Sequence, residues 1–218
     1  MGKTIGVLGG GQLGKMLFEA GSPTNTSYVF LETNYECPAS LVCKNQVIGS
    51  LQNEIKIKEL GSLSDVVTYE IEHVNVEALL ALEKSGIPVI PKPSVLTIIQ
   101  DKGLQKEYYA DNGVATLDFS LATIENLADK VAAWPEDNFV LKHRKGGYDG
   151  KGVQLLTKEK FATLLAAQDE SLKSEHGYVI EKLANNATEI SVIVAVAQDK
   201  STSTYPPCEM VFDPRSNL

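Results

Sequence analysis

The chain contains the stretch Lys142-His143-Arg144-Lys145-Gly146-Gly147-Tyr148-Asp149-Gly150-Lys151-Gly152, which lies between two apolar runs, residues 139–141 and 153–156. This pattern predicts a strand, a glycine-rich loop and a second strand. Glycine accepts positive φ and lets the backbone approach a ligand closely. Backbone N–H groups in such a loop, together with the basic side chains, favour a polyphosphate. The alternative is a solvated β-hairpin turn, because Asp-Gly is a common hairpin signal. The G-x-x-x-x-G-K-[ST] pattern of a P-loop is absent.

Composition narrows the possible partners. The 218 residues carry a formal net charge of -8, which argues against nucleic acid or an anionic membrane as the main partner. A small anionic ligand, bound by the local basic loops, is a more suitable partner for an acidic chain than nucleic acid or a membrane. Cys37, Cys43 and Cys208 are too sparse for a disulfide framework or a zinc site. The sequence has no signal-peptide pattern and no apolar run of membrane-spanning length. Together with the sparse cysteines, this favours a cytoplasmic protein.

The first part of the chain alternates strand and helix patterns. Helices are expected at residues 15–20, 54–60 and 76–85, between strands at residues 4–8, 27–31, 46–49, 65–69 and 87–90. This alternation predicts a parallel sheet with helices on both faces. Ligands of such sheets lie at the carboxyl ends of the strands, where Glu70 and Glu72 stand.

A glycine motif follows the first strand. Gly9, Gly11 and Gly14 fit G-x-G-x-x-G between a strand and a helix, as in dinucleotide-binding folds. Glu32 ends the second strand, where an acid would hold a ribose hydroxyl. NAD binding is therefore one hypothesis from the residues alone.

The second part begins after Pro91-Lys92-Pro93, which we interpret as a linker. One helix is expected over residues 95–111, with Lys102 and Lys106 on a solvated face. Further helices are expected at residues 121–133 and 158–168, and strands at residues 178–183 and 188–196. The last of these is long, apolar and predicted to be antiparallel to its neighbours.

Five motifs follow one another along the chain: Gly9-Gly10-Gly11-Gln12-Leu13-Gly14, Val67-Thr68-Tyr69-Glu70-Ile71-Glu72, Gln100-Asp101-Lys102, Lys142 with residues 146–152, and Glu181 followed by Glu189-Ile190-Ser191-Val192-Ile193. In this order they resemble the ATP-grasp superfamily and, within it, the N5-carboxyaminoimidazole ribonucleotide synthetase family. The resemblance covers the whole chain. It implies an α/β fold with a Rossmann-like parallel-sheet domain on the substrate side (residues 1–92), followed by an incomplete ATP-grasp α+β domain. That second domain would comprise a small subdomain with the glycine-rich loop (residues 93–172) and the beginning of the large subdomain (residues 173–218).

The resemblance also implies an ATP site. Lys102 and Lys142 would hold phosphates, and the glycine-rich loop would cover them. Glu181 and the backbone after it would recognise adenine, and Glu189 would accept from the ribose. The implied ATP-binding residues are Lys102, Lys142, Gly147, Tyr148, Asp149, Gly150, Lys151, Gly152, Val153, Glu181, Lys182, Leu183, Ala184 and Glu189. The implied catalytic residues are Tyr148, Asp149 and Lys151.

The implied reaction is ligation in purine biosynthesis. ATP would phosphorylate bicarbonate to carboxyphosphate, and the exocyclic amine of 5-aminoimidazole ribonucleotide would then be carboxylated behind a loop that excludes water. The implied substrate-binding residues are Gly11, Gln12, Leu13, Glu70, Glu72, Tyr148 and Lys151. Glu70 or Glu72 would receive the amine. This interpretation displaces the NAD hypothesis.

Two departures from the family pattern set further expectations. The position where many relatives carry a histidine is Phe212, so no ATP contact is expected there. The Mg²⁺ ligands of the family are expected beyond residue 218, and no metal ligand is assigned within the chain. Because phosphoryl transfer depends on the metal, we expect the 218 residues alone to be inactive. We also expect an unpaired edge at residues 188–196 and a homodimeric full-length protein.

Two alternatives stay open. One is a different ATP-grasp ligase, such as a formate-dependent glycinamide ribonucleotide transformylase. The other is a non-catalytic Rossmann-like module that holds a nucleotide or NAD. Residues 69–72 and the Gly-Gly-Tyr-Asp-Gly sequence favour the carboxylating enzyme.

Overall fold

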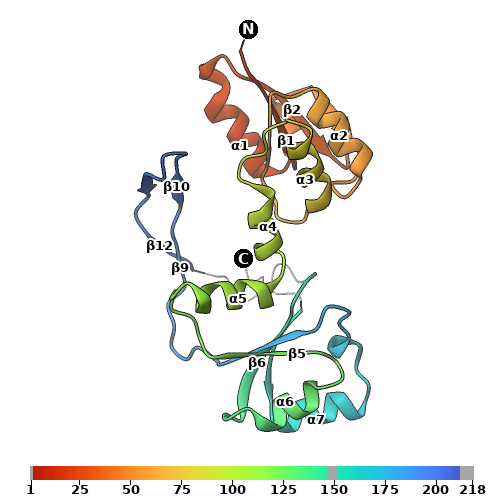
Figure 1. Cartoon of the computed structure of the whole chain (residues 1–218), viewed down its shortest axis with the longest axis vertical. Coiled ribbons are helices and arrows are strands. Elements are labelled where there is room, and N and C mark those ends of the chain that lie inside the picture. The colour runs from red at the N-terminus through yellow and green to blue at the C-terminus, as the bar shows by residue number, and fades with distance from the viewer. Residues whose placement is uncertain (1, 147–151, 212–218) are drawn as a thin grey trace.

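The computed structural model describes residues 2–146 and 152–211. Figure 1 shows two units joined through a helical segment, with an arm of short strands beside them. The elements are β1 (Thr4–Leu8), α1 (Gln12–Gly21), η1 (Ser22–Thr24), β2 (Ser27–Glu32), η2 (Pro38–Leu41), β3 (Gln46–Ile48), α2 (Glu54–Ser62), β4 (Val66–Tyr69), α3 (Val76–Lys84), α4 (Pro93–Ile99), α5 (Lys102–Asp111), β5 (Phe119–Ala122), α6 (Leu127–Ala133), β6 (Asn138–His143), β7 (Val153–Thr157), α7 (Lys158–Ala166), η3 (Glu170–Leu172), β8 (Tyr178–Glu181), β9 (Ile190–Ser191), β10 (Val194–Val196), β11 (Thr202–Thr204) and β12 (Cys208–Glu209).

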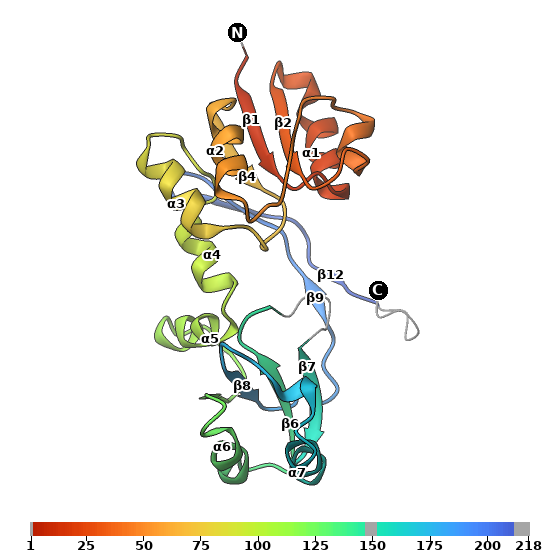
Figure 2. The same cartoon turned by 90° about the vertical axis from the view of Figure 1, so that its right-hand side faces the viewer.

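The first unit is a four-stranded sheet in the order β3-β2-β1-β4, with every pairing parallel. The predicted parallel sheet is therefore confirmed. Successive side chains of β2 face opposite sides of the sheet. Phe30 packs with η2 and partly buried Phe18 of α1, whereas Leu31 packs with residues of α2 and α3. Figures 1 and 2 show α1 on one face and α2 and α3 on the other. The predicted strand at residues 87–90 is wrong in extent, because only Val89 bridges to the sheet, at Val67.

The helical segment between the units is broken. A single helix over residues 95–111 is the wrong prediction, because α4 ends at Ile99 and α5 starts at Lys102. Asp101 adopts an extended conformation between them, and its Oδ1 accepts from Gly103 N at 2.9 Å and Leu104 N at 3.2 Å. This carboxylate caps the new helix and satisfies donors that have no partner inside it.

The second unit is an antiparallel sheet in the order β5-β8-β6-β7. Strands β6 and β7 confirm the predicted strands on both sides of the glycine-rich stretch, and α7 and β8 confirm a helix and a strand near their predicted places. Helices α6 and α7 pack on the sheet through Leu127, Val131 and Phe161. The predicted helix at residues 121–133 is wrong at its start, because residues 119–122 form β5 and pair with β8.

Both units together give the α/β and α+β combination that the sequence predicted. Strand β8 comes from the segment predicted to begin the large subdomain, yet it pairs with β5 and β6 of the small one. The boundaries at residues 92/93 and 172/173 stay a prediction.

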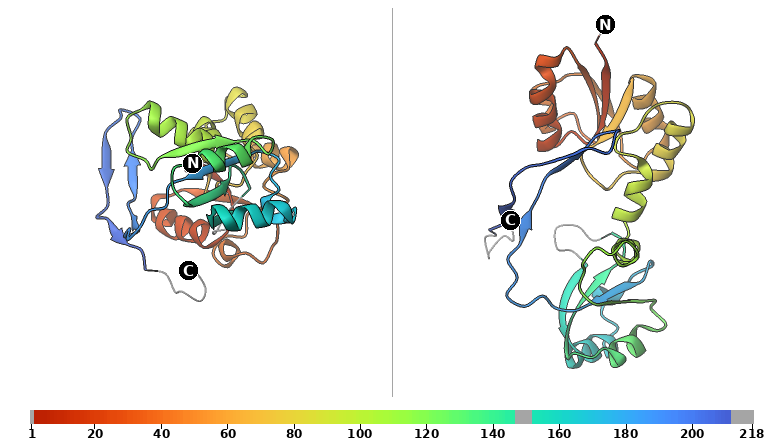
Figure 3. Two further views of the ribbon diagram at one scale, coloured as in Figure 1. Left: turned by 90° about the horizontal axis from the view of Figure 1, so that it is seen from below. Right: turned by 60° about the vertical axis from the view of Figure 1, so that its left-hand side comes forward.

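The arm comprises residues 184–211, all of which are exposed. The predicted long strand at residues 188–196 is wrong, because it is divided into β9 and β10. Its antiparallel pairing is confirmed, since β10 pairs with β11 and β9 with β12. Figure 3 shows the arm extending from the second unit back toward the first. Ile193 and Val196 are 64% and 67% exposed, so the arm presents apolar surface to solvent. In the part of the chain that the structure describes, every helix is too short or too polar to cross a bilayer.

Candidate functional site

A buried carboxylate lies between two lysines where the second sheet meets α5. Glu181 is the last residue of β8 and is 4% exposed. Its Oε2 lies 2.5 Å from Nζ of Lys142, which β6 supplies from the neighbouring strand. Its Oε1 accepts from Nζ of Lys106 on α5. We call Lys106, Lys142 and Glu181 the carboxylate cluster.

The charges of the carboxylate cluster keep Glu181 ionised. Burial raises the pKa of Glu181, but the hydrogen bonds and charges of Lys106 and Lys142 lower it by more, so the pKa lies below its ordinary value. An ionised carboxylate is only an acceptor, so this group selects ligands that carry a donor.

Lys102 stands one helical turn before Lys106 and shares the electrostatic field of the cluster. Burial lowers the pKa of Lys102, the charge of Lys142 lowers it further, and the charges of Glu72 and Asp101 raise it by less. Two ammonium groups that disfavour each other's charge form a site at which an anion is stabilised. The structure thus brings together both lysines predicted to hold phosphates and one acid predicted to bind the second substrate.

A second, partly buried ion pair holds the start of α5 against the end of β6. Arg144 donates to both oxygens of Asp101, with Nε–Oδ1 at 2.8 Å and Nη2–Oδ2 at 3.0 Å. The backbone adds Lys102 N to Arg144 O at 2.9 Å. Gln100 continues the connection, since its Nε2 donates to Glu72 O at 2.6 Å and to Val74 O at 2.9 Å. Residues 100–102 therefore tie the acidic loop after β4 to the strand that carries Lys142.

The glycine loop after β1 holds carboxylates of its own chain. Gly10 N donates to Glu32 Oε2 at 2.9 Å, and Gly11 N donates to Glu70 Oε1 at 3.0 Å. Burial raises the pKa of Glu32, but hydrogen bonds from Gly10 and Thr33 lower it by more. These acids occupy the donors that a phosphate would need, and their charge would repel it. The geometry thus argues against a dinucleotide at this loop.

The remaining residues predicted for the second substrate lie at the same edge of the first sheet. Gln12 and Leu13 are the first residues of α1 and are exposed. Glu70 and Glu72 follow the carboxyl end of β4, and the Glu72 side chain is 46% exposed.

The remaining described residues predicted for ATP lie in three places. Gly152 and Val153 lie beside β6, since His143 N donates to Gly152 O at 2.8 Å and Val153 pairs with Lys142. Residues 182–184 follow Glu181 directly, and the Lys182 side chain turns to Glu136, 3.3 Å away. Glu189 lies at the base of the arm, exposed, and makes none of the carboxylate-cluster contacts that the structure describes. The residues Gly147, Tyr148, Asp149, Gly150, Lys151 and Phe212 lie outside the described part of the chain.

Sequence reasoning missed two members of this site. Lys106 was assigned to a solvated face, which is wrong, since its side chain is 13% exposed. Its partner is 75 residues away, so no local signal reveals the pairing. The role of Arg144 was likewise invisible from the sequence, although an aspartate such as Asp101 at the start of a helical pattern is a typical N-cap signal.

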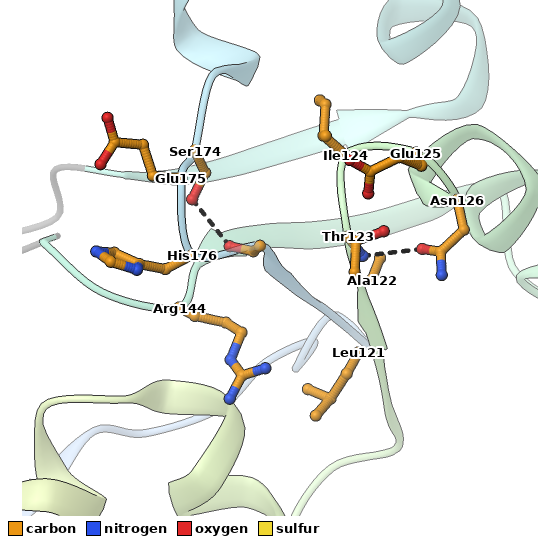
Figure 4. A pocket seen from close by; sticks show the side chains of 11 residues that line it. Leu121, Ala122, Thr123, Ile124, Glu125, Asn126, Arg144, Ser174, Glu175 and His176 are labelled. Atoms are coloured by element: carbon orange, nitrogen blue, oxygen red, sulfur yellow. Dashed lines mark hydrogen bonds between the residues drawn. The ribbon is translucent and has the colours of Figure 1, made fainter.

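A pocket of about 300 Å³ lies beside the second sheet, between residues 121–126 and 174–177. Figure 4 shows Arg144 at its edge, while two hydrogen bonds lie in its walls, from Ser174 Oγ to Gly177 O and from Thr123 N to Asn126 Oδ1. Because the Arg144 guanidinium is committed to Asp101, this pocket is a weaker candidate for an anion than the lysines near Glu181.

Within the described ranges, no group of three or more histidine, cysteine, aspartate or glutamate side chains is arranged to hold a metal ion. The expectation that Mg²⁺ ligands lie beyond residue 218 stays a prediction.

Two domain families match the chain. Residues 1–100 match the ribonucleotide synthetase preATP-grasp domain, and residues 107–213 match the ATP-grasp domain. Among relatives, the phosphoribosylaminoimidazole carboxylase of Vigna aconitifolia is 36% identical over 206 residues, covering 94% of this chain and 36% of the relative. The N5-carboxyaminoimidazole ribonucleotide synthase of Staphylococcus saprophyticus is 32% identical, covering 94% of this chain and 53% of the relative.

Solved structures agree. The N5-carboxyaminoimidazole synthetase of Staphylococcus aureus with ADP superposes with a TM-score of 0.86 at 27% identity, over 96% of this chain and 55% of that one. The Aspergillus clavatus enzyme with ATP superposes with a TM-score of 0.85 at 30% identity, over 97% of this chain and 55% of that one. The Aspergillus clavatus enzyme with ADP and 5-aminoimidazole ribonucleotide superposes with a TM-score of 0.83 at 27% identity, over 98% of this chain and 54% of that one. The chain spans about a third to a half of the length of these relatives. The chain belongs to the N5-carboxyaminoimidazole ribonucleotide synthetase family of the ATP-grasp superfamily.

Proposed function

We propose that this chain provides the nucleotide- and substrate-binding parts of an ATP- and bicarbonate-dependent ligase. The ligase would carboxylate 5-aminoimidazole ribonucleotide to N5-carboxyaminoimidazole ribonucleotide in purine biosynthesis. The observation that carries the proposal is the buried carboxylate cluster with Lys102 beside it. It offers cations for phosphates and one ionised acceptor for a purine amine.

On the ATP side, Lys102 and Lys142 bind phosphates, and Glu181 with residues 182–184 binds adenine. Lys142 is 29% exposed and is paired with Glu181. A triphosphate competes for the same ammonium group, so nucleotide binding exchanges the partner of Lys142. Gly152 and Val153 flank this lysine, and Glu189 accepts from the ribose. Tyr148, Asp149 and Lys151 stay the predicted catalytic residues, and Gly147 and Gly150 complete the predicted loop.

On the substrate side, Glu70 and Glu72 offer carboxylates to the exocyclic amine, next to Gly11, Gln12 and Leu13. A carboxylate that accepts from an amine holds its nitrogen in place for attack. The Aspergillus clavatus structure with ADP and 5-aminoimidazole ribonucleotide supports a site for both ligands in this family.

The reaction is a phosphoryl transfer followed by a carboxyl transfer. A bicarbonate oxygen takes the γ-phosphoryl group of ATP, which releases ADP, and the amine nitrogen then bonds to the carboxyl carbon as phosphate departs. Lysine ammonium groups stabilise charge that develops on the phosphoryl oxygens. Mg²⁺, when bound, would neutralise further phosphate charge, and its ligands are predicted beyond residue 218. The full-length protein is proposed to be a cytoplasmic homodimer whose contact surface lies partly beyond that residue.

The first test is nucleotide binding by the 218-residue chain. We expect a fluorescent ATP analogue to bind, and Lys142→Met to weaken binding at least tenfold. Lys173→Met is the matched control, because Lys173 pairs only at the surface, with Glu170. Binding of NADH without binding of ATP would instead support the non-catalytic module.

The second test is the acyl donor. A full-length relative carrying residues 1–218 of this chain should release ADP only with 5-aminoimidazole ribonucleotide and bicarbonate. Formate-dependent release of ADP with glycinamide ribonucleotide would favour the alternative ligase. The 218 residues alone are expected to give no ADP above background.

A further inference from the structure

Lys106 is fixed more firmly than the other lysine of the carboxylate cluster. Besides its pair with Glu181, its Nζ donates to Thr116 Oγ1 at 2.7 Å and lies 6.0 Å from the centre of the Phe119 ring. Its side chain is 13% exposed, against 29% for Lys142. Lys106 is therefore held by a carboxylate, a hydroxyl and an aromatic face.

The two lysines contact different oxygens of one carboxylate. Lys106 pairs with Oε1 of Glu181, and Lys142 lies 2.5 Å from Oε2. In the proposed function Lys142 turns to a phosphate, which releases Oε2. Glu181 would then be a buried carboxylate that still needs a counter-charge, and Lys106 supplies it.

We propose that Lys106 is a positioning residue that determines the preference for adenine over 6-oxopurines. It stays paired with Oε1 of Glu181, so that Oε2 is left as an ionised acceptor aimed at the 6-amino group of the bound purine. This inference rests on the proposed ATP site.

The selectivity follows from hydrogen-bond chemistry. An ionised carboxylate accepts from the 6-amino group of adenine but faces an acceptor in hypoxanthine, whose 6-oxo group cannot donate. A buried polar group left without its partner costs binding free energy, so the 6-oxopurine is rejected. Without Lys106, burial favours the protonated form of Glu181, which can donate to a 6-oxo group. Loss of Lys106 should therefore change the ratio of affinities as well as their size.

The test is calorimetric titration of the 218-residue chain with ATP and with inosine triphosphate. We expect the native chain to prefer ATP, and Lys106→Met to reduce the ATP-to-inosine ratio of affinities at least tenfold. Lys106→Arg keeps the charge and should restore most of the ratio. The matched control is Lys158→Met, because Lys158 Nζ is also committed within the second unit, to Trp134 O at 2.6 Å. It should leave the ratio unchanged.

The outcomes separate the two proposals. If the native chain binds neither nucleotide, the proposed function fails and this inference fails with it. If the native chain prefers ATP and Lys106→Met weakens both nucleotides equally, the proposed function stands and the positioning role is wrong. Fluorescence of Trp134 reports whether each variant folds. If Lys106→Met does not fold, Thr116→Val removes one anchor of Lys106 while keeping its charge, and an unchanged ratio in that variant overturns the inference.

Discussion

Replacing Arg144 by methionine tests whether the ion pair with Asp101 holds α5 against the second sheet. The variant keeps the aliphatic part of the side chain and removes both donors to the carboxylate. Asp101 is then left buried with its two backbone donors alone, Gly103 N and Leu104 N.

The magnitude follows from burial. Removing one partner of a fully buried pair costs about 3–5 kcal/mol, whereas an exposed pair contributes about 0–1 kcal/mol. The Asp101 side chain is 6% exposed and that of Arg144 is 25% exposed. We therefore expect Arg144→Met to lower the free energy of unfolding by about 2–3 kcal/mol. Asp101→Ala should cost about 1 kcal/mol more, because it also removes the helix cap.

The assay is urea unfolding followed by fluorescence of Trp134, the one tryptophan of the chain. Trp134 is 7% exposed and packs in the core of the second unit, so it reports on the unit that carries Arg144 and against which the pair holds α5. With an m-value of about 2 kcal/mol/M, the midpoint of Arg144→Met should fall by about 1–1.5 M. Lys173→Met is the control for an exposed pair. A midpoint for Arg144→Met no lower than that of the control would refute the reasoning.

Three further outcomes follow from the same geometry. Gly103→Ala should destabilise the chain, because the added Cβ would lie 2.5 Å from Arg144 Nε. This cost should outweigh the better helix propensity of alanine, and a urea midpoint at or above the native value would contradict the prediction. Gly9→Ala should destabilise the first unit by about 1–3 kcal/mol, because the φ of Gly9 is +98° and the added Cβ would lie 2.6 Å from Glu70 Cγ. Hydrogen exchange of the β1 amides measures this loss of stability, and unchanged protection would contradict the predicted backbone strain. Burial raises the pKa of Asp101, but Arg144 and the backbone donors lower it by more, so the pKa lies below its ordinary value. The stability difference between the native chain and Arg144→Met should therefore be complete at neutral pH and shrink as the pH falls below the ordinary range of an aspartate; urea midpoints at pH 7 and pH 3 test the sign, and a difference that grows at pH 3 would contradict it.

Much of the fold was predictable because its signals are local. The strands of the first sheet are short runs rich in apolar residues, and the sheet is parallel as the alternation of helices and strands predicts. The errors arose where a local pattern competed with pairing. Residues 119–122 have a helical pattern next to them but pair with β8. The break before α5 had a local signal in Asp101, which outweighed the continuous apolar period.

The candidate site shows the same limit. Lys142 and Glu181 could be singled out because each ends or nearly ends a predicted strand and matches a family motif. Lys106 could not, because its role depends on a carboxylate 75 residues later in the chain and on Phe119, which lies outside every predicted element. A contact between a helix and a strand that are far apart in the sequence is set by tertiary packing, which a local pattern does not encode.

The glycine loop after β1 shows that a motif and its ligand preference are separable. Glu32 and Glu70 lie 22 and 59 residues from their amide partners in the sequence. Their carboxylates nevertheless occupy the N–H donors of the glycine loop, so the loop presents negative charge and does not offer a site for an anion. Any sequence with this glycine spacing and acids at the ends of both strands beside the first one should accordingly be examined for ammonium-like or amine ligands before nicotinamide cofactors. The sign of the charge that such a loop attracts is encoded far from the glycines themselves.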